Sequence, residues 1–254
     1  MSGPIVVKIG GSTLGADDTT LADLVALQQD GRRLIVVHGG GALITQWLDR
    51  LGVESTFVDG LRSTDAEALR VVIAVLRGVV NTELVAGISA LGGRATGLSG
   101  VDGATVSAER YDERLGFVGR ITGVDATLLR AVADCGAIPV IAPIGIEAPG
   151  QPLNINADTV AGEVARAVEA EQLIFLTDVD GLMDAEGRVL AEIDAQRAES
   201  LRRAETLAGG MIPKVEACLR AAELGTVARI ANGRLPGTLR RIINGEQAGT
   251  RVGG

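Results

Sequence analysis

The sequence predicts an α/β protein, a three-layer αβα sandwich with a mostly parallel central sheet. Short runs rich in Val, Ile and Leu alternate along the chain with longer segments of helical periodicity. This alternation is typical of a sheet whose strands are connected by helices. Hydrophobic residues make up 46 % of the chain and aromatic residues only 2 %. The core must therefore be aliphatic, which suits buried parallel strands covered by helices.

Strands are expected where four to six apolar residues lie next to glycine, proline or charged residues. They cover residues 5–8, 34–38, 95–98, 138–142, 173–177 and 227–230. The polar, glycine-containing segment 107–122 predicts a β-hairpin between the third and fourth of these strands.

Helices are expected in the segments between the strands, at 21–29, 42–51, 65–80, 157–170, 194–207, 213–224 and 237–244. The helix 65–80 has a nearly all-apolar middle at 71–76. A helix that is apolar almost all round either lies in the core or faces another subunit. No proline-rich or serine-rich linker and no internal repeat interrupts the pattern, so a division near residue 170 would separate two lobes that share one sheet.

Composition excludes several classes of function. A net charge of −8 and a pI near 4.8 argue against a nucleic-acid surface, because phosphate backbones require a basic face. Cys135 and Cys218 lie far apart without a Cys-x-x-Cys spacing, so we expect buried structural thiols and no metal site. The longest apolar stretch, residues 136–146, is too short to span a bilayer. No cationic segment followed by an apolar core opens the chain, so we expect no signal peptide. We expect a soluble cytoplasmic protein.

Lysine occurs only twice in the chain, as Lys8 and Lys214, whereas arginine occurs 22 times. Both lysines lie beside glycines: Lys8 precedes Gly10 and Gly11, and Lys214 follows Gly209 and Gly210. A lysine ammonium is a compact point charge that can lie among phosphate oxygens, unlike the planar guanidinium of arginine. Codon bias alone would explain the scarcity of lysine but not its placement, so we interpret both lysines as functional.

Two glycine clusters follow the first two predicted strands, at 10–11 and at 39–41. Consecutive glycines let backbone N–H groups approach an anion closely, and ligands of open α/β sheets bind at the carboxyl ends of strands. The clusters therefore predict a phosphate cradle. Neither has the Gly-x-Gly-x-x-Gly spacing of a dinucleotide-binding fold, and no Gly-Lys pair exists for a Walker loop.

These motifs resemble the amino-acid kinase family. The matching segments run in order along nearly the whole chain, at 8–11, 38–41, 60–65, 115–119, 154–158, 176–179, 209–215 and 249–251. Within the family, Gly-Leu-Arg at 60–62 and Asn-x-Asn-Ala-Asp at 154–158 resemble members that act on N-acetyl-L-glutamate. Ser63 replaces the usual valine of the first of these motifs but leaves Arg62 in place.

The resemblance implies the amino-acid kinase fold and phosphorylation of the side-chain carboxylate of N-acetyl-L-glutamate by ATP with Mg²⁺, in arginine biosynthesis. It implies a substrate-binding and dimerisation lobe at 1–170 and a nucleotide-binding lobe at 171–254. The implied catalytic residues are Lys8, Lys214 and Asp158; the substrate-binding residues are Gly40, Gly41, Arg62 and Asn154. The implied nucleotide-binding residues are Gly10, Gly11, Asp178, Gly209, Gly210 and Met211, and no residue is assigned to a metal.

The residue chemistry agrees with this reaction. A carboxylate nucleophile is ionised at neutral pH and requires no general base, whereas bringing an anion to a polyanion requires positive charge. Simpler roles exist for some residues: His38 as a structural hydrogen-bonding group, Asn156 as a helix cap, and Asp178 as a turn residue. The alternatives are a kinase for another N-blocked acidic amino acid, such as a carrier-linked aminoadipate or glutamate, and a non-catalytic sensor on the same fold.

Arginine-inhibited members of the family carry an additional N-terminal helix that links dimers into hexamers. Here the first predicted strand begins at residue 5, so we expect a homodimer that is insensitive to arginine.

Overall fold

The computed structural model describes residues 3–10, 19–58 and 60–253. An eight-stranded sheet forms its centre, in the order β12-β14-β13-β11-β1-β2-β8-β5. All neighbouring strands of this sheet are parallel except β13 and β14. Strands from both sides of residue 170 belong to it, so the structure has the expected shared sheet. The division into functional lobes remains a prediction.

The strands of the large sheet are β1 (Ile5–Ile9), β2 (Leu34–His38), β5 (Ala95–Ser99), β8 (Ile138–Ala142), β11 (Gln172–Thr177), β12 (Glu192–Ile193), β13 (Val227–Asn232) and β14 (Thr250–Val252). A smaller sheet contains β6 (Val106–Arg110), β7 (Gly119–Val124), β9 (Ile144–Glu147) and β10 (Gln151–Asn154), and β3 (Phe57–Val58) pairs with β4 (Leu61–Arg62). The antiparallel pair β6–β7 is the hairpin that the sequence predicts.

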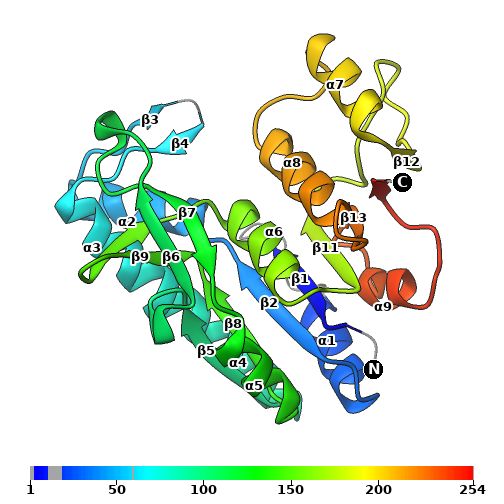
Figure 1. The fold of residues 1–254 in the computed structure, drawn as a ribbon, viewed down its shortest axis with the longest axis horizontal. Helices are drawn as coiled ribbons and strands as arrows, with labels where there is room; N and C mark the ends of the chain where they lie inside the picture. Colours follow the sequence, from blue (N-terminus) through cyan, green and yellow to red (C-terminus); the bar gives the residue numbers. More distant parts are fainter. Residues whose placement is uncertain (1–2, 11–18, 59, 254) are drawn as a thin grey trace.

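Helices cover both faces of the large sheet (Figure 1). One face packs against α1 (Thr20–Gln29), α2 (Gly41–Leu51), α3 (Ala66–Ile73), α4 (Asn81–Ala90) and α9 (Thr238–Ile243). The other packs against α5 (Thr127–Asp134), α6 (Ala157–Ala167), α7 (Ala195–Arg203) and α8 (Met211–Ala222). The residues of each strand alternate between these two cores, as the pleat requires. The three-layer αβα sandwich is confirmed.

The predicted helix 65–80 ends in the wrong place. After α3 the chain continues as a π-helical segment, η1 (Ala74–Val80), and then directly as α4. Asn81, the polar residue that follows the predicted end, is fully buried. Its side-chain hydrogen bonds replace those that water would supply, so the helix continues through it.

The continuous helix Ala66–Ala90 also corrects the expectation that no apolar segment is long enough to span a bilayer. It has 25 residues and a mean hydropathy of 1.8 in its most apolar stretch, which suffices for a membrane span by length and composition. In the structure 44 % of that stretch is buried, and its inner side packs on the central sheet. A core helix of a folded domain has the same properties.

The two cysteines differ in their surroundings. Cys218 is buried in α8, as expected. Cys135 is exposed, against expectation, because it follows the last residue of α5 at the surface. The buried residues of that helix are Leu129 and Ala133.

Candidate active site

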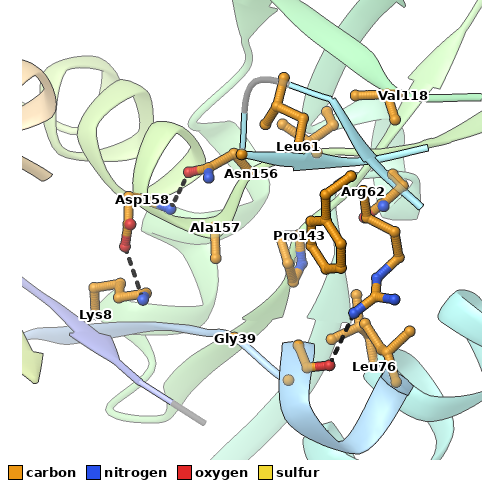
Figure 2. Close-up of a pocket in the computed structure, with 17 residues that line it drawn as sticks. Lys8, Gly39, Leu61, Arg62, Leu76, Val118, Pro143, Asn156, Ala157 and Asp158 are labelled. Carbon is orange, nitrogen blue, oxygen red and sulfur yellow. Dashed lines mark hydrogen bonds and ion pairs between the residues drawn. The ribbon is translucent and has the colours of Figure 1, made fainter. Parts of the chain in front are cut away.

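Lys8 and Asp158 form a buried ion pair between the central strand β1 and the first turn of α6. The Lys8 side chain leaves β1 towards the α6 face, and its Nζ lies 2.7 Å from Asp158 Oδ1. Both residues are less than a tenth exposed. Asn156 caps α6: its Oδ1 accepts hydrogen bonds from the N–H groups of Asp158 (2.9 Å) and Thr159 (3.1 Å). The cap fixes the backbone that carries Asp158, and Figure 2 shows the two charged side chains facing each other.

Lys214 reaches the same carboxylate from α8. Its Nζ lies 2.9 Å from Asp158 Oδ2, so each carboxylate oxygen has one ammonium group. The Lys214 ammonium also donates to the carbonyl of Gly210, at 2.9 Å, in the loop that precedes α8. The only two lysines of the chain thus meet at one aspartate, although 205 residues separate them (8 to 214 in the sequence).

Burial and the charges of Lys8, Lys214 and Asp158 together determine the pKa values in this cluster. Burial raises the pKa of Asp158, but the two lysine charges outweigh burial and leave the pKa below its ordinary value. Burial is the largest effect on Lys8 and lowers its pKa; Asp158 opposes this effect, and Lys214 adds to it. The cluster of two ammonium groups and one carboxylate carries a net positive charge that a bound anion can neutralise.

A cavity of about 260 Å³ lies beside this cluster (Figure 2). Its polar lining includes Lys8, Asp158, Arg62, Asn154 and the glycine loop 39–41. Its apolar lining consists of Ile44, Phe57, Leu61, Leu76, Val118, Pro143, Ile155 and Ala157. A positive charge at one end and apolar walls elsewhere suit a small ligand that has both anionic and apolar groups.

Arg62 is held at the cavity wall by several contacts. Its Nη2 donates to Thr45 Oγ1 (2.7 Å) and to the carbonyl of Gly41 (3.1 Å), and its Nη1 donates to Ser55 Oγ. The ring of Phe57 covers the guanidinium, with 4.7 Å between the Arg62 Cζ and the ring centroid. These contacts aim a guanidinium at the cavity in a fixed direction, as recognition of a carboxylate requires.

The register of the sheet brings the predicted glycine loops together. Ile9 pairs with Leu176 of β11 on one side and with His38 of β2 on the other. Gly10 and the loop 39–41 therefore leave neighbouring strands at the same edge. Gly11 lies outside the described residues. Asn154, across the cavity, donates to Thr64 Oγ1 at 3.1 Å.

The remaining predicted nucleotide-binding residues lie at the same sheet edge or near Lys214. Asp178 follows β11, where its Oδ1 accepts from Thr177 Oγ1 (3.2 Å) and its Oδ2 lies 3.7 Å from Arg234 Nη2. Gly209, Gly210 and Met211 form the entry to α8. None of these four lines the cavity of Figure 2. Among the residues that the structure describes, no group of His, Cys, Asp and Glu is arranged to hold a metal ion.

Sequence reasoning missed the residues that support the site from outside its motifs. Ser55, Thr45 and Phe57 hold Arg62, and Leu76 closes the cavity from the π-helical segment. Their residue types are common and gave no signal. Asn81 follows the predicted helix 65–80 directly and was not considered.

The amino acid kinase family matches residues 3–232 of this chain. That range contains both lysines, Asp158, Arg62 and both glycine loops. The chain belongs to the amino acid kinase family. An acetylglutamate kinase from Dehalococcoides mccartyi is 41 % identical over 98 % of this chain and 93 % of its own length. Another, from a Ruegeria species, is 44 % identical over 91 % of this chain and 82 % of its own length.

Solved structures share the amino acid kinase fold. The crystal structure of smu.665 from Streptococcus mutans superposes with a TM-score of 0.87 at 28 % identity, and the match covers 100 % of this chain and 99 % of the other. The likeness extends over both sides of residue 170, so the central sheet and the helices on its two faces belong to the common fold of the family.

Proposed function

We propose that this protein transfers the γ-phosphoryl group of ATP to the side-chain carboxylate of N-acetyl-L-glutamate, in arginine biosynthesis. A carboxylate oxygen forms the new bond to phosphorus, and the bond between the γ-phosphorus and the bridging oxygen breaks. The products are N-acetyl-L-glutamyl 5-phosphate and ADP. The curated relatives that match nearly the full chain at 41–44 % identity bear the name of this activity.

The observation that carries the proposal is the pair of lysines held on Asp158 beside a cavity with a fixed guanidinium. The reaction requires no proton transfer to activate the nucleophile, so its barrier is mainly the approach of one anion to another. Lys8 and Lys214 reach the transferring group from β1 and α8, and stabilise the charge that it carries in the transition state. Asp158 is the positioning residue that holds both.

We assign the substrates to the two sides of this cluster. Arg62 and Asn154 hold the acylated amino acid in the lobe 1–170, with the N–H groups of Gly40 and Gly41. Gly10, Gly11, Asp178 and the loop Gly209–Met211 bind the nucleotide, mainly in the lobe 171–254. Magnesium arrives with ATP and is held by phosphate oxygens and water, in keeping with its preference for few protein ligands.

We further propose a cytoplasmic homodimer. The helix Ala66–Ala90 buries one side on the sheet and leaves apolar groups such as Ile73 and Val79 partly exposed on the other, which suits contact with a second copy. Two unpaired cysteines suit a reducing compartment. Light scattering of the purified protein tests the dimer, and a monomer at micromolar concentration would contradict it.

Incubation with MgATP, N-acetyl-L-glutamate and hydroxylamine tests the activity, because hydroxylamine converts an acyl phosphate to a coloured hydroxamate. Glutamate, aspartate and N-acetyl-aminoadipate are assayed in parallel. Hydroxamate formed fastest from N-acetyl-L-glutamate supports the proposal. Preference for the aminoadipate would assign the protein to another N-blocked amino acid, and no hydroxamate from folded protein that still binds its ligands would indicate a sensor.

A further inference from the structure

A buried hydrogen-bond network lies beneath the glycine loop, on the face of the sheet opposite to Lys8. His38 is the last residue of β2 and directly precedes the loop. Its ring points to the core that contains the helix Ala66–Ala90, whereas Lys8 points to α6. His38 is 1 % exposed, and Asn81, its partner on α4, is 0 % exposed. No ligand reaches either side chain directly, so any effect on the reaction passes through the loop.

The contacts define the tautomer of His38. Its Nδ1 lies 3.0 Å from the carbonyl oxygen of Gly39, which can only accept, so Nδ1 carries the proton. Its Nε2 then accepts a hydrogen bond from Asn81 Nδ2, at 3.1 Å. Burial, with the charges of Lys8 and Arg77, outweighs the bond to Gly39 and lowers the pKa of His38 to about 4. The imidazole is therefore neutral, and each ring nitrogen has the role that its neighbour requires.

The orientation of Asn81 is itself determined by its surroundings. Its Oδ1 accepts from Arg77 Nη1 (3.2 Å), and its Nδ2 also donates to the carbonyl of Val140 (2.8 Å). The amide cannot rotate by 180° without losing both bonds, so the Nδ2 group faces His38. Gly97 leaves the required space, because a Cβ there would lie only 2.1 Å from Asn81 Oδ1.

The π-helical segment contacts the loop a second time. A Cβ on Gly40 would lie 2.7 Å from Leu76 Cδ2 and 3.5 Å from Val80 Cγ2, and both of these residues belong to η1. Asn81 follows η1 directly. The π-helical segment therefore packs under Gly40, and Asn81, the residue that follows it, supports His38. π-helical turns are frequent at functional sites.

We propose that His38, supported by Asn81, is a positioning residue that fixes the Gly40 N–H, so that this group holds the acylated amino acid in line for phosphoryl transfer. The Gly39 carbonyl and the Gly40 N–H belong to one peptide plane and point in opposite directions when the bond is trans. Among the described residues only Ala148–Pro149 is cis. The bond from His38 to the Gly39 carbonyl therefore turns the Gly40 N–H away from the ring, and within the described chain that N–H donates to no other group.

This inference rests on the proposed function, and two substitutions of His38 test it. In histidine Nδ1 is bonded to Cγ, as the amide nitrogen of asparagine is, whereas the amide of glutamine lies one carbon further out, near the position of Nε2. His38→Asn can therefore still donate to the Gly39 carbonyl, and His38→Gln cannot. Both variants lose the imidazole and resemble each other in polarity, so each controls for the other.

We expect His38→Gln to lower kcat about 100-fold, as removal of an oriented transition-state donor does, with little change in the KM for ATP. The kcat of His38→Asn should be about tenfold or more higher than that of His38→Gln, because a displacement of a positioning group by about 1 Å is enough to lower the rate that much. Rates are expressed per folded molecule, from thermal melts of each variant. If His38→Gln does not fold, Gly97→Ala takes its place, since its methyl group displaces the Asn81 amide and leaves His38 unchanged.

Equal kcat for folded His38→Gln and wild type would overturn the proposal, and so would equal losses in the two variants. A structural role alone would lower the melting temperature and leave kcat per folded molecule unchanged. Wild-type protein in the same hydroxamate assay separates this inference from the function itself. An inactive wild type contradicts the proposed function, whereas an active wild type with an equally active His38→Gln contradicts only the positioning role.

Discussion

Replacement of Asp158 by asparagine removes the charge on which both lysines converge and keeps the shape of the side chain. In the structure each oxygen of Asp158 has one ammonium group, at 2.7 Å from Lys8 and 2.9 Å from Lys214. Removal of one partner of a buried ion pair costs about 3–5 kcal/mol when the other charge remains. Lys8 can avoid this cost by losing its proton, since burial already lowers its pKa and Asp158 is the main group that opposes the shift.

The expected result is therefore a change in the pH dependence as well as in the rate. Without Asp158 the pKa of Lys8 falls further, so Lys8 loses its proton at a lower pH than in wild type. Loss of one transition-state cation lowers kcat about 100- to 1000-fold, or about 3–4 kcal/mol. A lysine is charged below its pKa, so the activity of Asp158→Asn should rise as the pH is lowered through the pKa of Lys8.

The assay is the hydroxamate rate as a function of pH for wild type, Asp158→Asn and Glu163→Gln. Glu163 lies on the same helix, is partly buried, and forms ion pairs with Arg166 and with Arg220 of α8, both at 3.2 Å. It does not line the cavity. Its substitution should leave kcat unchanged. A rate for Asp158→Asn within tenfold of wild type, or a rate that does not rise as the pH is lowered, would refute the reasoning.

Unfolding experiments on the same variants provide an independent check of the charge state. The pKa of folded Asp158 lies below its unfolded value of about 4. Its contribution to the free energy of unfolding is therefore complete above that value and is lost as the pH falls through the folded pKa. The difference in stability between wild type and Asp158→Asn should thus shrink in acid. A constant difference down to low pH would mean that Asp158 is not ionised in the folded protein.

Three further predictions follow from the same geometry. Lys8→Arg and Lys214→Arg keep the charge but should each lower kcat about 100-fold or more. Near-normal turnover in either variant would mean that the rarity of lysine in this chain reflects codon bias and not a need for the ammonium group. Arg62→Lys should raise the KM for the acylated amino acid at least tenfold, as about 1.4 kcal/mol of lost carboxylate recognition implies, while the KM for ATP stays constant; equal changes in both would contradict its role. Gly162→Ala puts a Cβ 2.8 Å from an alanine of α8 and should lower the free energy of unfolding by about 1–3 kcal/mol in urea. Gly123→Ala, with no atom within 4 Å of the added Cβ, is its control, and equal stability of the two variants would contradict the tight α6–α8 contact.

The sequence was most informative where burial is complete. The strands 34–38 and 138–142 were predicted with the ends that they have in the structure, because a strand covered on both faces consists of apolar residues throughout. The segment after Ala142 was missed: Pro143 separates β8 from β9, and the apolar residues of both strands read as one run. Helix α5 was also missed, since its buried residues, Leu129 and Ala133, are too few to give a clear period.

The site was predictable only as far as its motifs. Glycine loops and lone lysines are visible in a sequence because their residue types are unusual for their surroundings. The side chains that fix Arg62 and His38 cannot be recognised in the sequence. Ser55, Thr45 and Asn81 are common residue types, and their role is evident only once the fold brings them next to Arg62 and His38. Pairing of Lys8 with Lys214 through Asp158 depends on the packing of α6 against α8 and β1, which no local pattern contains.

The ion-pair geometry explains why lysine occurs at these two positions in a chain that otherwise uses arginine. An arginine beside a carboxylate tends to take both oxygens with its two parallel N–H groups. One guanidinium on Asp158 would therefore displace the second cation from it. An ammonium takes one oxygen and leaves the other, so a single aspartate can hold Lys8 and Lys214 together. Each ammonium has three donors, so donors remain for phosphate oxygens after the bond to Asp158 is made. Two compact cations on one carboxylate thus require a lysine at both positions. A single arginine substitution at either position should already displace the other cation from Asp158.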